Sequence, residues 1–226
     1  MKYTKLGNTG VDVSKICMGM MSFGKPGSEN GLFPWARDFD DAKPIFQRAI
    51  ELGVNFFDTA NVYQMGSSEI VTGQLIKAFN LDRDDIVVST KVNFPMRPDR
   101  PNGGGLSRKN IMAEIDHSLK RMQLDYVDLY QIHRLDPHTP MEETMEALHD
   151  VVKSGKARYI GASSSRHHRH QPYRRRGRRA GSHTKPGRDR CAGGTLYSSC
   201  CPERILTECR AGGPHFAPRP AHFTYQ

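Results

Sequence analysis

The sequence lacks any apolar run approaching the ~18 residues that a membrane-spanning helix needs. The first residues also lack the apolar core of a signal peptide. With 25% charged residues and a mean hydropathy of −0.63, the chain is typical of a water-soluble protein. We therefore predict a cytoplasmic protein with no membrane partner.

The last part of the chain has few acidic and few large apolar residues. Of the 33 Lys and Arg residues, 13 follow Ser165, but only three of the 24 Asp and Glu residues do, so the net charge is −1 up to Ser165 and +10 after it. Only five Leu, Ile, Val, Met or Phe residues occur there. Such a composition does not support a packed core. We predict a folded domain over residues 1–165 and a disordered or frameshifted tail over residues 166–226.

The tail also lacks the Cys-x2-Cys spacing of structural zinc sites, although four of the five cysteines and six of the ten histidines lie in it. We therefore expect no metal site. Clustered arginines could contact nucleic-acid phosphates, but a charge run without a folded domain to present it is more typical of disorder. We expect no nucleic-acid partner.

Residues 1–165 alternate short apolar segments with amphipathic ones. A hairpin is expected over residues 1–14. The apolar segments predict strands at 15–20, 54–58, 86–90, 126–132 and 157–162, and apolar residues at helical spacing predict helices at about 38–52, 67–79, 107–122 and 139–154. Repeated alternation of strand and helix predicts a parallel sheet with crossover helices.

Three segments carry more specific signals. Ser107 is suited to cap the third helix, and Thr139, Pro140 and Glu142 form the pattern of a capping box for the fourth. The long loop after the first strand of the predicted sheet carries the only tryptophan, Trp35. This side chain fits either a wall of a substrate pocket or the anchor of a lid.

Three predicted strands end in ionisable residues, namely Asp58, Lys91 and His133, and Tyr63 follows the first of them in a loop. Taken singly, Asp58 could be a turn residue, Lys91 an exposed lysine and His133 a histidine bonded to backbone at the core edge. Because the carboxyl ends of parallel strands meet on one face, the four together predict a shared site.

These residue types suit proton donation to a carbonyl oxygen. A tyrosine with an unperturbed pKa of about 10 is a poor donor. A neighbouring lysine ammonium stabilises the tyrosinate and lowers that pKa, and an aspartate can hold the lysine in place. A neutral histidine can orient the carbonyl group.

Four segments closely resemble the aldo-keto reductases, in particular the branch near aryl-alcohol dehydrogenases and potassium-channel β subunits. They are N-F-F-D-T-A-N-V-Y (55–63), S-T-K (89–91), Q-I-H (131–133) and G-A-S-S (161–164), in the family's order. The resemblance covers roughly residues 1–164. It implies a (β/α)8 barrel that uses NADPH, without metal, to reduce an aldehyde or ketone. Tyr63 would be the general acid, Lys91 and Asp58 its tuning pair, and His133 the orienting group.

The resemblance also implies which residues contact the cofactor. Ser163 and Ser164 fall where the family binds the nicotinamide carboxamide, although the two serines could instead cap a following helix. Gly19 and Met20 end the first strand of the predicted sheet near cofactor and substrate, and Asp58 would face the cofactor too.

Only five strands can be counted before Ser165, whereas a full barrel typically takes ~250 residues. We therefore predict a barrel truncated after about five strands, and a frameshift near codon 165 as its cause. Downstream reading frames without a barrel-like strand pattern would contradict that hypothesis. A non-enzymatic chain that binds a cofactor or partner, or an inactive pseudogene product, are the alternatives. The sequence does not predict an oligomeric state.

Overall fold

Five parallel strands form one sheet and follow one another in sequence order. They are β3 (Met18–Gly19), β4 (Phe56–Asp58), β5 (Val87–Val92), β6 (Val127–Ile132) and β7 (Ala157–Ala162). The connecting helices are α1 (Phe39–Glu51), α2 (Ser67–Ala78), α3 (Arg108–Met122) and α4 (Met141–Lys153), and a 3-10 turn, η1 (Tyr63–Gly66), precedes α2. The computed structural model describes residues 1–26 and 33–163, so the predicted tail and Ser164 lie outside the described residues.

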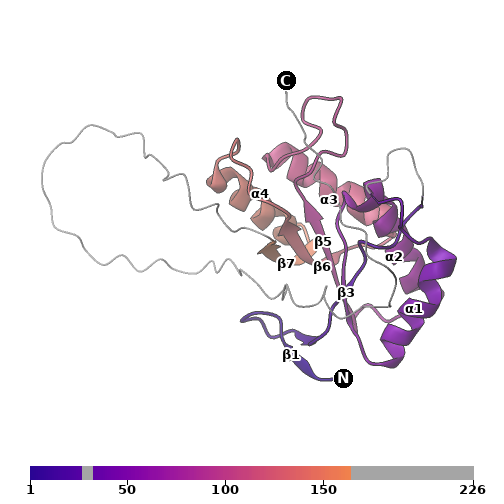
Figure 1. Ribbon diagram of the computed structural model, residues 1–226. Coiled ribbons are helices and arrows are strands. Elements are labelled where there is room, and N and C mark those ends of the chain that lie inside the picture. Colours follow the sequence, from indigo (N-terminus) through magenta and orange to yellow (C-terminus); the bar gives the residue numbers. More distant parts are fainter. Residues whose placement is uncertain (27–32, 164–226) are drawn as a thin grey trace, which may run out of the picture.

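Parallel strands that pair in sequence order, each joined to the next by a helix, have the winding of a (β/α) barrel. The predicted α/β fold, a partial barrel of five strands, is therefore confirmed. Figure 1 shows the helices along one face of the sheet, where α1 contacts α2, α2 contacts α3 and α3 contacts α4. None of the helices in the described ranges combines the length and apolar character needed to cross a membrane.

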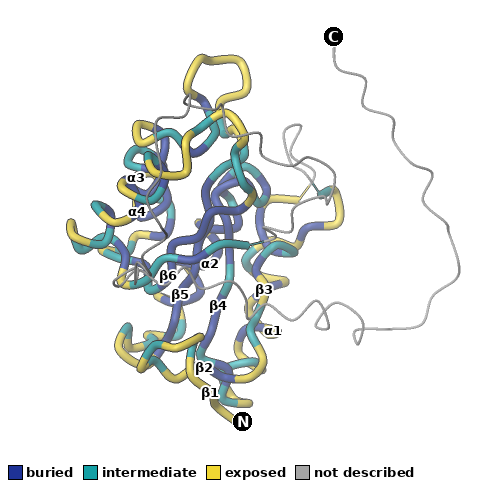
Figure 2. Tube along the Cα trace, turned by 90° about the vertical axis from the view of Figure 1, so that its left-hand side faces the viewer, coloured by how far each residue is buried: buried dark blue, intermediate teal, exposed yellow. Residues whose placement is uncertain are grey.

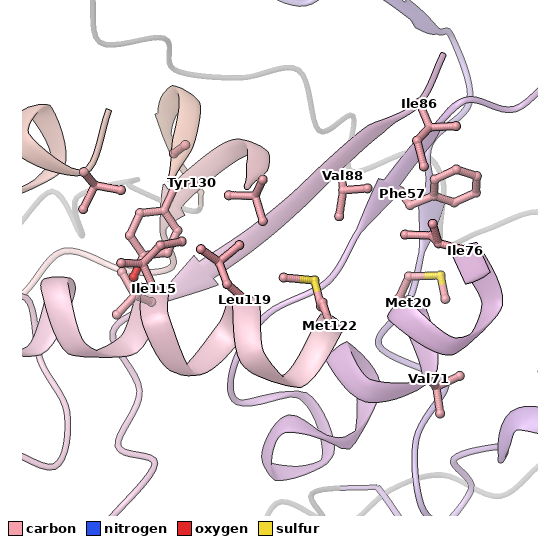
Figure 3. Packing of buried hydrophobic residues seen from close by; sticks show 14 of the residues in the cluster. Met20, Phe57, Val71, Ile76, Ile86, Val88, Ile115, Leu119, Met122 and Tyr130 are labelled. Carbon is pink, nitrogen blue, oxygen red and sulfur yellow. The ribbon is translucent and has the colours of Figure 1, made fainter. Parts of the chain in front are cut away.

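The main core lies between the sheet and the helices. Figure 3 shows side chains from the strands, including Phe57 and Val88, facing side chains of α2 and α3, including Ile76 and Ile115. All four belong to one cluster of buried apolar residues, and Phe57, Val88 and Ile115 have no exposed surface. Figure 2 shows this burial along the centre of the sheet, with the exposed residues mostly in the connecting segments. Burial of this face fixes which side of each strand points toward the helices.

A smaller cluster covers the other face of the sheet near the amino-terminal ends of its strands. Phe56, Val87 and Leu129 pack there with Val13. Val13 belongs to the antiparallel hairpin of β1 (Tyr3–Lys5) and β2 (Asp12–Ser14). The predicted hairpin thus exists and covers the amino-terminal ends of the strands, so that polar side chains can occupy their carboxyl ends. We refer to the face of the sheet opposite the helices as the inner face.

The helix starts agree only partly with prediction. Ser107 caps α3 through a backbone N–H of the first turn, as expected. The capping box predicted at Thr139 is wrong, because α4 begins at Met141 without a side-chain cap. The Thr139 hydroxyl instead donates to the carboxylate of Asp136 at 2.7 Å, which also accepts the backbone N–H of Leu106. A charged acceptor makes the stronger hydrogen bond and draws the threonine away from the helix.

Candidate active site

The predicted site residues lie at the carboxyl edge of the sheet. Asp58 ends β4, Lys91 lies one residue before the end of β5, and His133 directly follows β6. Each lies an even number of residues from the member of the inner-face cluster on its own strand, so its side chain points to the same face, opposite the helices. Tyr63 begins the turn η1, five residues beyond Asp58.

Lys91 is at the centre of the site. Its ammonium donates to Asp58 Oδ2 at 2.5 Å and to the Thr59 carbonyl oxygen at 2.9 Å, and Nζ lies 3.5 Å from the Tyr63 hydroxyl. The Lys91 side chain is only 3% exposed. A buried ammonium requires such oxygen partners to offset the loss of water. The Lys91 ammonium therefore lies between the Asp58 carboxylate and the Tyr63 phenol and contacts both.

The second oxygen of Asp58 is held by two residues that the sequence analysis missed. Ser89 Oγ donates to Asp58 Oδ1 at 2.9 Å, and Gln131 Nε2 lies 3.2 Å from the same oxygen and 2.6 Å from Ser89 Oγ. The signal was available, because Ser89 precedes Lys91 by two residues and Gln131 precedes His133 by two. Positions two apart on a strand share a face.

His133 is buried beside this group. Its ring lies edge-on to Tyr63, with 5.5 Å between ring centroids, and edge-on to Phe94 at 4.9 Å. Burial, followed by the nearby Lys91 ammonium, lowers the pKa of His133 to about 4. The imidazole is therefore neutral near pH 7. Within the described residues, its buried Nδ1 has no hydrogen-bond partner.

The predicted cofactor residues divide into three groups. Gly19 is exposed and pairs in register with Asp58, and a Cβ added to Gly19 would meet nothing within 4 Å. Ser163 is half-buried directly after β7, and Ser164 lies outside the described residues. Met20 is completely buried and packs in the core between sheet and helices (Figure 3). The Met20 side chain therefore faces away from the site, and its backbone N–H donates to the Asp58 carbonyl at 2.8 Å.

No group of three His, Cys, Asp or Glu side chains within residues 1–26 and 33–163 could hold a metal ion. The cysteine and histidine residues of the tail lie outside those ranges.

A second polar cluster, which the sequence analysis also missed, lies behind the sheet under α2 and α3. Glu69 accepts hydrogen bonds from Thr90 Oγ1 and from Arg121 Nε, each at 2.5 Å. Glu114 accepts from the Asn61 amide at 3.0 Å. Thr90 precedes Lys91, and Asn61 lies two residues before Tyr63, so this buried cluster is attached to two of the segments that form the site. We call it the rear cluster.

Comparison with known proteins agrees with this geometry. A model of the Aldo/keto reductase family matches residues 15–178. The versiconal hemiacetal acetate reductase of Aspergillus parasiticus is 40% identical over 180 residues, which cover 73% of this chain and 51% of the relative. A Schizosaccharomyces pombe protein provisionally named as a voltage-gated potassium channel subunit beta is 40% identical over 159 residues, or 70% of this chain and 44% of the relative.

A solved structure gives the same result. A thermostable aldo-keto reductase in complex with the inhibitor epalrestat superposes with a TM-score of 0.59 at 32% identity, over 73% of this chain and 54% of that one. The chain spans about half the length of the curated relatives that it matches.

Proposed function

Because this chain belongs to the aldo/keto reductase family, we propose that it is a cytoplasmic enzyme that reduces a small aldehyde or ketone with NADPH, with Tyr63 as the proton donor. The observation that carries this proposal is the position of the Lys91 ammonium, which binds the Asp58 carboxylate and lies 3.5 Å from the Tyr63 hydroxyl.

The residues at the carboxyl edge of the sheet fit the nicotinamide end of this cofactor. Open space lies over Gly19, next to Asp58. Ser163 follows β7, and its backbone N–H donates at 2.8 Å to the carbonyl oxygen of Ile132, the residue before His133. Gly19, Asp58 and Ser163 would hold the nicotinamide end, with Ser164 next in the sequence. The chemistry that this cofactor supplies is a hydride for the carbonyl carbon.

The chain's own residues would manage the proton. As the carbonyl carbon is reduced, negative charge develops on the oxygen and the Tyr63 phenol donates its proton there. The Lys91 ammonium stabilises the tyrosinate that remains, and Asp58 keeps the ammonium in place. Tyr63 is half-buried, so solvent water can return the proton after each turnover.

His133 would orient the carbonyl group. Its pKa of about 4 keeps the imidazole neutral near pH 7. A neutral imidazole has one N–H that can donate a hydrogen bond to the carbonyl oxygen. It holds the oxygen near Tyr63 without adding a second positive charge beside Lys91.

Tyr63→Phe tests this mechanism, because it removes only the hydroxyl. We expect NADPH-dependent reduction of an aldehyde by the full chain to fall by about 10²–10⁴-fold, the usual contribution of a general acid. NADPH binding, followed by quenching of tryptophan fluorescence, should change little. Tyr126→Phe is the matched control, since Tyr126 lies at the opposite end of β6 against Arg83. Unchanged turnover in Tyr63→Phe, or no turnover by the unmodified chain, would contradict the proposal.

A second function is favoured by one of the relatives. The Schizosaccharomyces pombe protein carries the name of a potassium channel subunit, not of an enzyme. In this second proposal the chain binds NADPH and a protein partner without turnover. Cofactor binding with no reduction of any carbonyl compound would favour this reading, whereas measurable turnover would exclude it.

A further inference from the structure

The turn that carries Tyr63 has an unusual backbone. Three successive residues after Tyr63 have positive φ angles, namely Gln64 at 48°, Met65 at 52° and Gly66 at 91°. Glycine adopts such angles freely, but each non-glycine residue in the left-handed region is strained unless its surroundings hold it there. The question is therefore what holds Gln64 and Met65.

Gln64 is held by a distant segment of the chain. Its side chain is buried and makes two hydrogen bonds to one residue: Oε1 accepts from the Phe33 N–H at 2.7 Å, and Nε2 donates to the Phe33 carbonyl at 2.7 Å. This pairing imitates the bonds between two strands. A primary amide carries its donor and its acceptor on two separate atoms, as this pairing requires.

The other arm of the β3–α1 connection packs on the same turn. A Cβ added to Gly24 would lie 2.9 Å from the Gln64 Cβ. The Lys25 N–H donates to Ser67 Oγ at 2.9 Å, and that hydroxyl lies 2.9 Å from the Gln64 carbonyl oxygen. Both arms of the connection are thus attached to the residues directly after Tyr63.

The segment that Gln64 binds carries an aromatic pair. The rings of Phe33 and Trp35 stack with 4.7 Å between centroids, and Trp35 is 54% exposed. An exposed indole stacked on a second ring is held in one orientation as long as Phe33 is held. Gln64 therefore connects an exposed aromatic surface to the residue next to the proposed proton donor.

We propose that Gln64 is a positioning residue: its two hydrogen bonds to Phe33 hold residues 33–35 against the turn η1, and this contact keeps the strained turn, and hence Tyr63, in place. The inference rests on the proposed function only for the role of Tyr63. The contact itself acts in the free chain, without cofactor or substrate.

Amide hydrogen exchange on the full chain tests this proposal, with Gln64→Leu as the variant. Leucine keeps a similar volume but loses both hydrogen bonds, so detached conformations should become roughly tenfold more populated. The Met65 amide, which donates to the Val62 carbonyl at 3.0 Å within the turn, should exchange roughly tenfold faster, and the Phe33 amide, which loses its acceptor on Gln64, should accelerate at least as much. The Val88 amide in the core strand β5 should not change. The fluorescence anisotropy of Trp35, the only tryptophan, should fall.

Gln47→Leu is the matched control, because Gln47 is exposed on α1 and bonds only to Glu51 among the residues that the structure describes. It should leave all three amides unchanged. Faster exchange at Phe33 with no change at Met65 would overturn the proposal, since the contact would then hold the connection but not the turn. Equal acceleration at Val88 would also overturn it, because the effect would be global unfolding.

Gln64→Glu decides the matter if Gln64→Leu does not fold. The carboxylate still accepts from the Phe33 N–H but opposes the Phe33 carbonyl oxygen, to which it cannot donate, so exchange at Phe33 and Met65 should be faster than in the native chain. Native exchange rates in this variant would overturn the proposal. Because no readout requires turnover, an inactive chain would contradict the proposed function and leave this test intact.

Discussion

Replacing Arg121 with methionine would test the energetics of the rear cluster. Arg121 Nε donates to Glu69 at 2.5 Å, and its guanidinium lies 3.7 Å from Glu114. The carboxylate side chains are 0% and 2% exposed, and the Arg121 side chain is 19% exposed. Methionine keeps the length and apolar stem of arginine but removes its charge, so two buried carboxylates lose their cation.

Removing one partner of a buried ion pair typically costs about 3–5 kcal/mol, because an uncompensated charge stays behind. A domain of ordinary stability has about 5–15 kcal/mol in total, so Arg121→Met should remove a large share of it. The exposed pair of Arg48 and Glu51 gives the comparison: its atoms lie 3.1 Å apart, but the side chains are 67% and 48% exposed. Arg48→Met should cost at most about 1 kcal/mol.

Urea unfolding at neutral pH, followed by circular dichroism, measures both variants. The double variant Glu69→Gln/Arg121→Met should recover part of the loss, because a neutral amide replaces one buried carboxylate. Arg121→Lys keeps the charge and should lose less stability than Arg121→Met. It replaces Arg121→Met in this test if the methionine variant does not fold. A cost below about 1 kcal/mol for Arg121→Met, equal to that of Arg48→Met, would refute the reasoning.

Two further predictions concern pH and packing. The pKa of His133 is about 4 in the folded chain and ~6.5 in the unfolded chain, so protonation favours the unfolded chain. The free energy of unfolding should therefore be highest above pH ~6.5 and fall by about 2–3 kcal/mol as the pH drops toward 4. Urea unfolding over this pH range should show the loss, and His133→Asn should show less pH dependence; equal pH dependence in both would contradict the assignment. In Gly73→Ala, the new Cβ would lie 2.0 Å from the Met122 carbonyl oxygen, so α2 and α3 must separate, and we expect a loss of about 1–3 kcal/mol. Gly10→Ala meets nothing within 4 Å and should change stability by no more than about 1 kcal/mol; similar unfolding midpoints for the two alanine variants would contradict the packing argument.

The sequence predicted the elements well because their signals are local. Strands near residues 54–58, 86–90 and 126–132 are found at Phe56–Asp58, Val87–Val92 and Val127–Ile132. The prediction failed where one local signal met a stronger one three residues away. Thr139 has the sequence of a helix cap, but the carboxylate of Asp136 takes its hydroxyl.

Apolar residues at helical spacing are not all buried in the structure. Ile45 and Leu52 follow the helical period of the first helix, yet they are 47% and 50% exposed. Periodicity gives the direction of a helix face but not how wide the contact with the sheet is. That width depends on how the helix lies on the sheet, which no local pattern contains.

The sequence by itself determined the alternation of strand and helix and the ionisable residues at the ends of three of the strands. These two facts bring Asp58, Lys91, Tyr63 and His133 to one edge, because side chains alternate along a strand and parallel strands end together. Only the tertiary structure decided which atoms meet. The bond from Gln131 to Asp58 spans 73 residues and the pair from Gln64 to Phe33 spans 31. Such contacts depend on strand register and on the packing of whole elements, which form cooperatively and leave no pattern in any short stretch of chain.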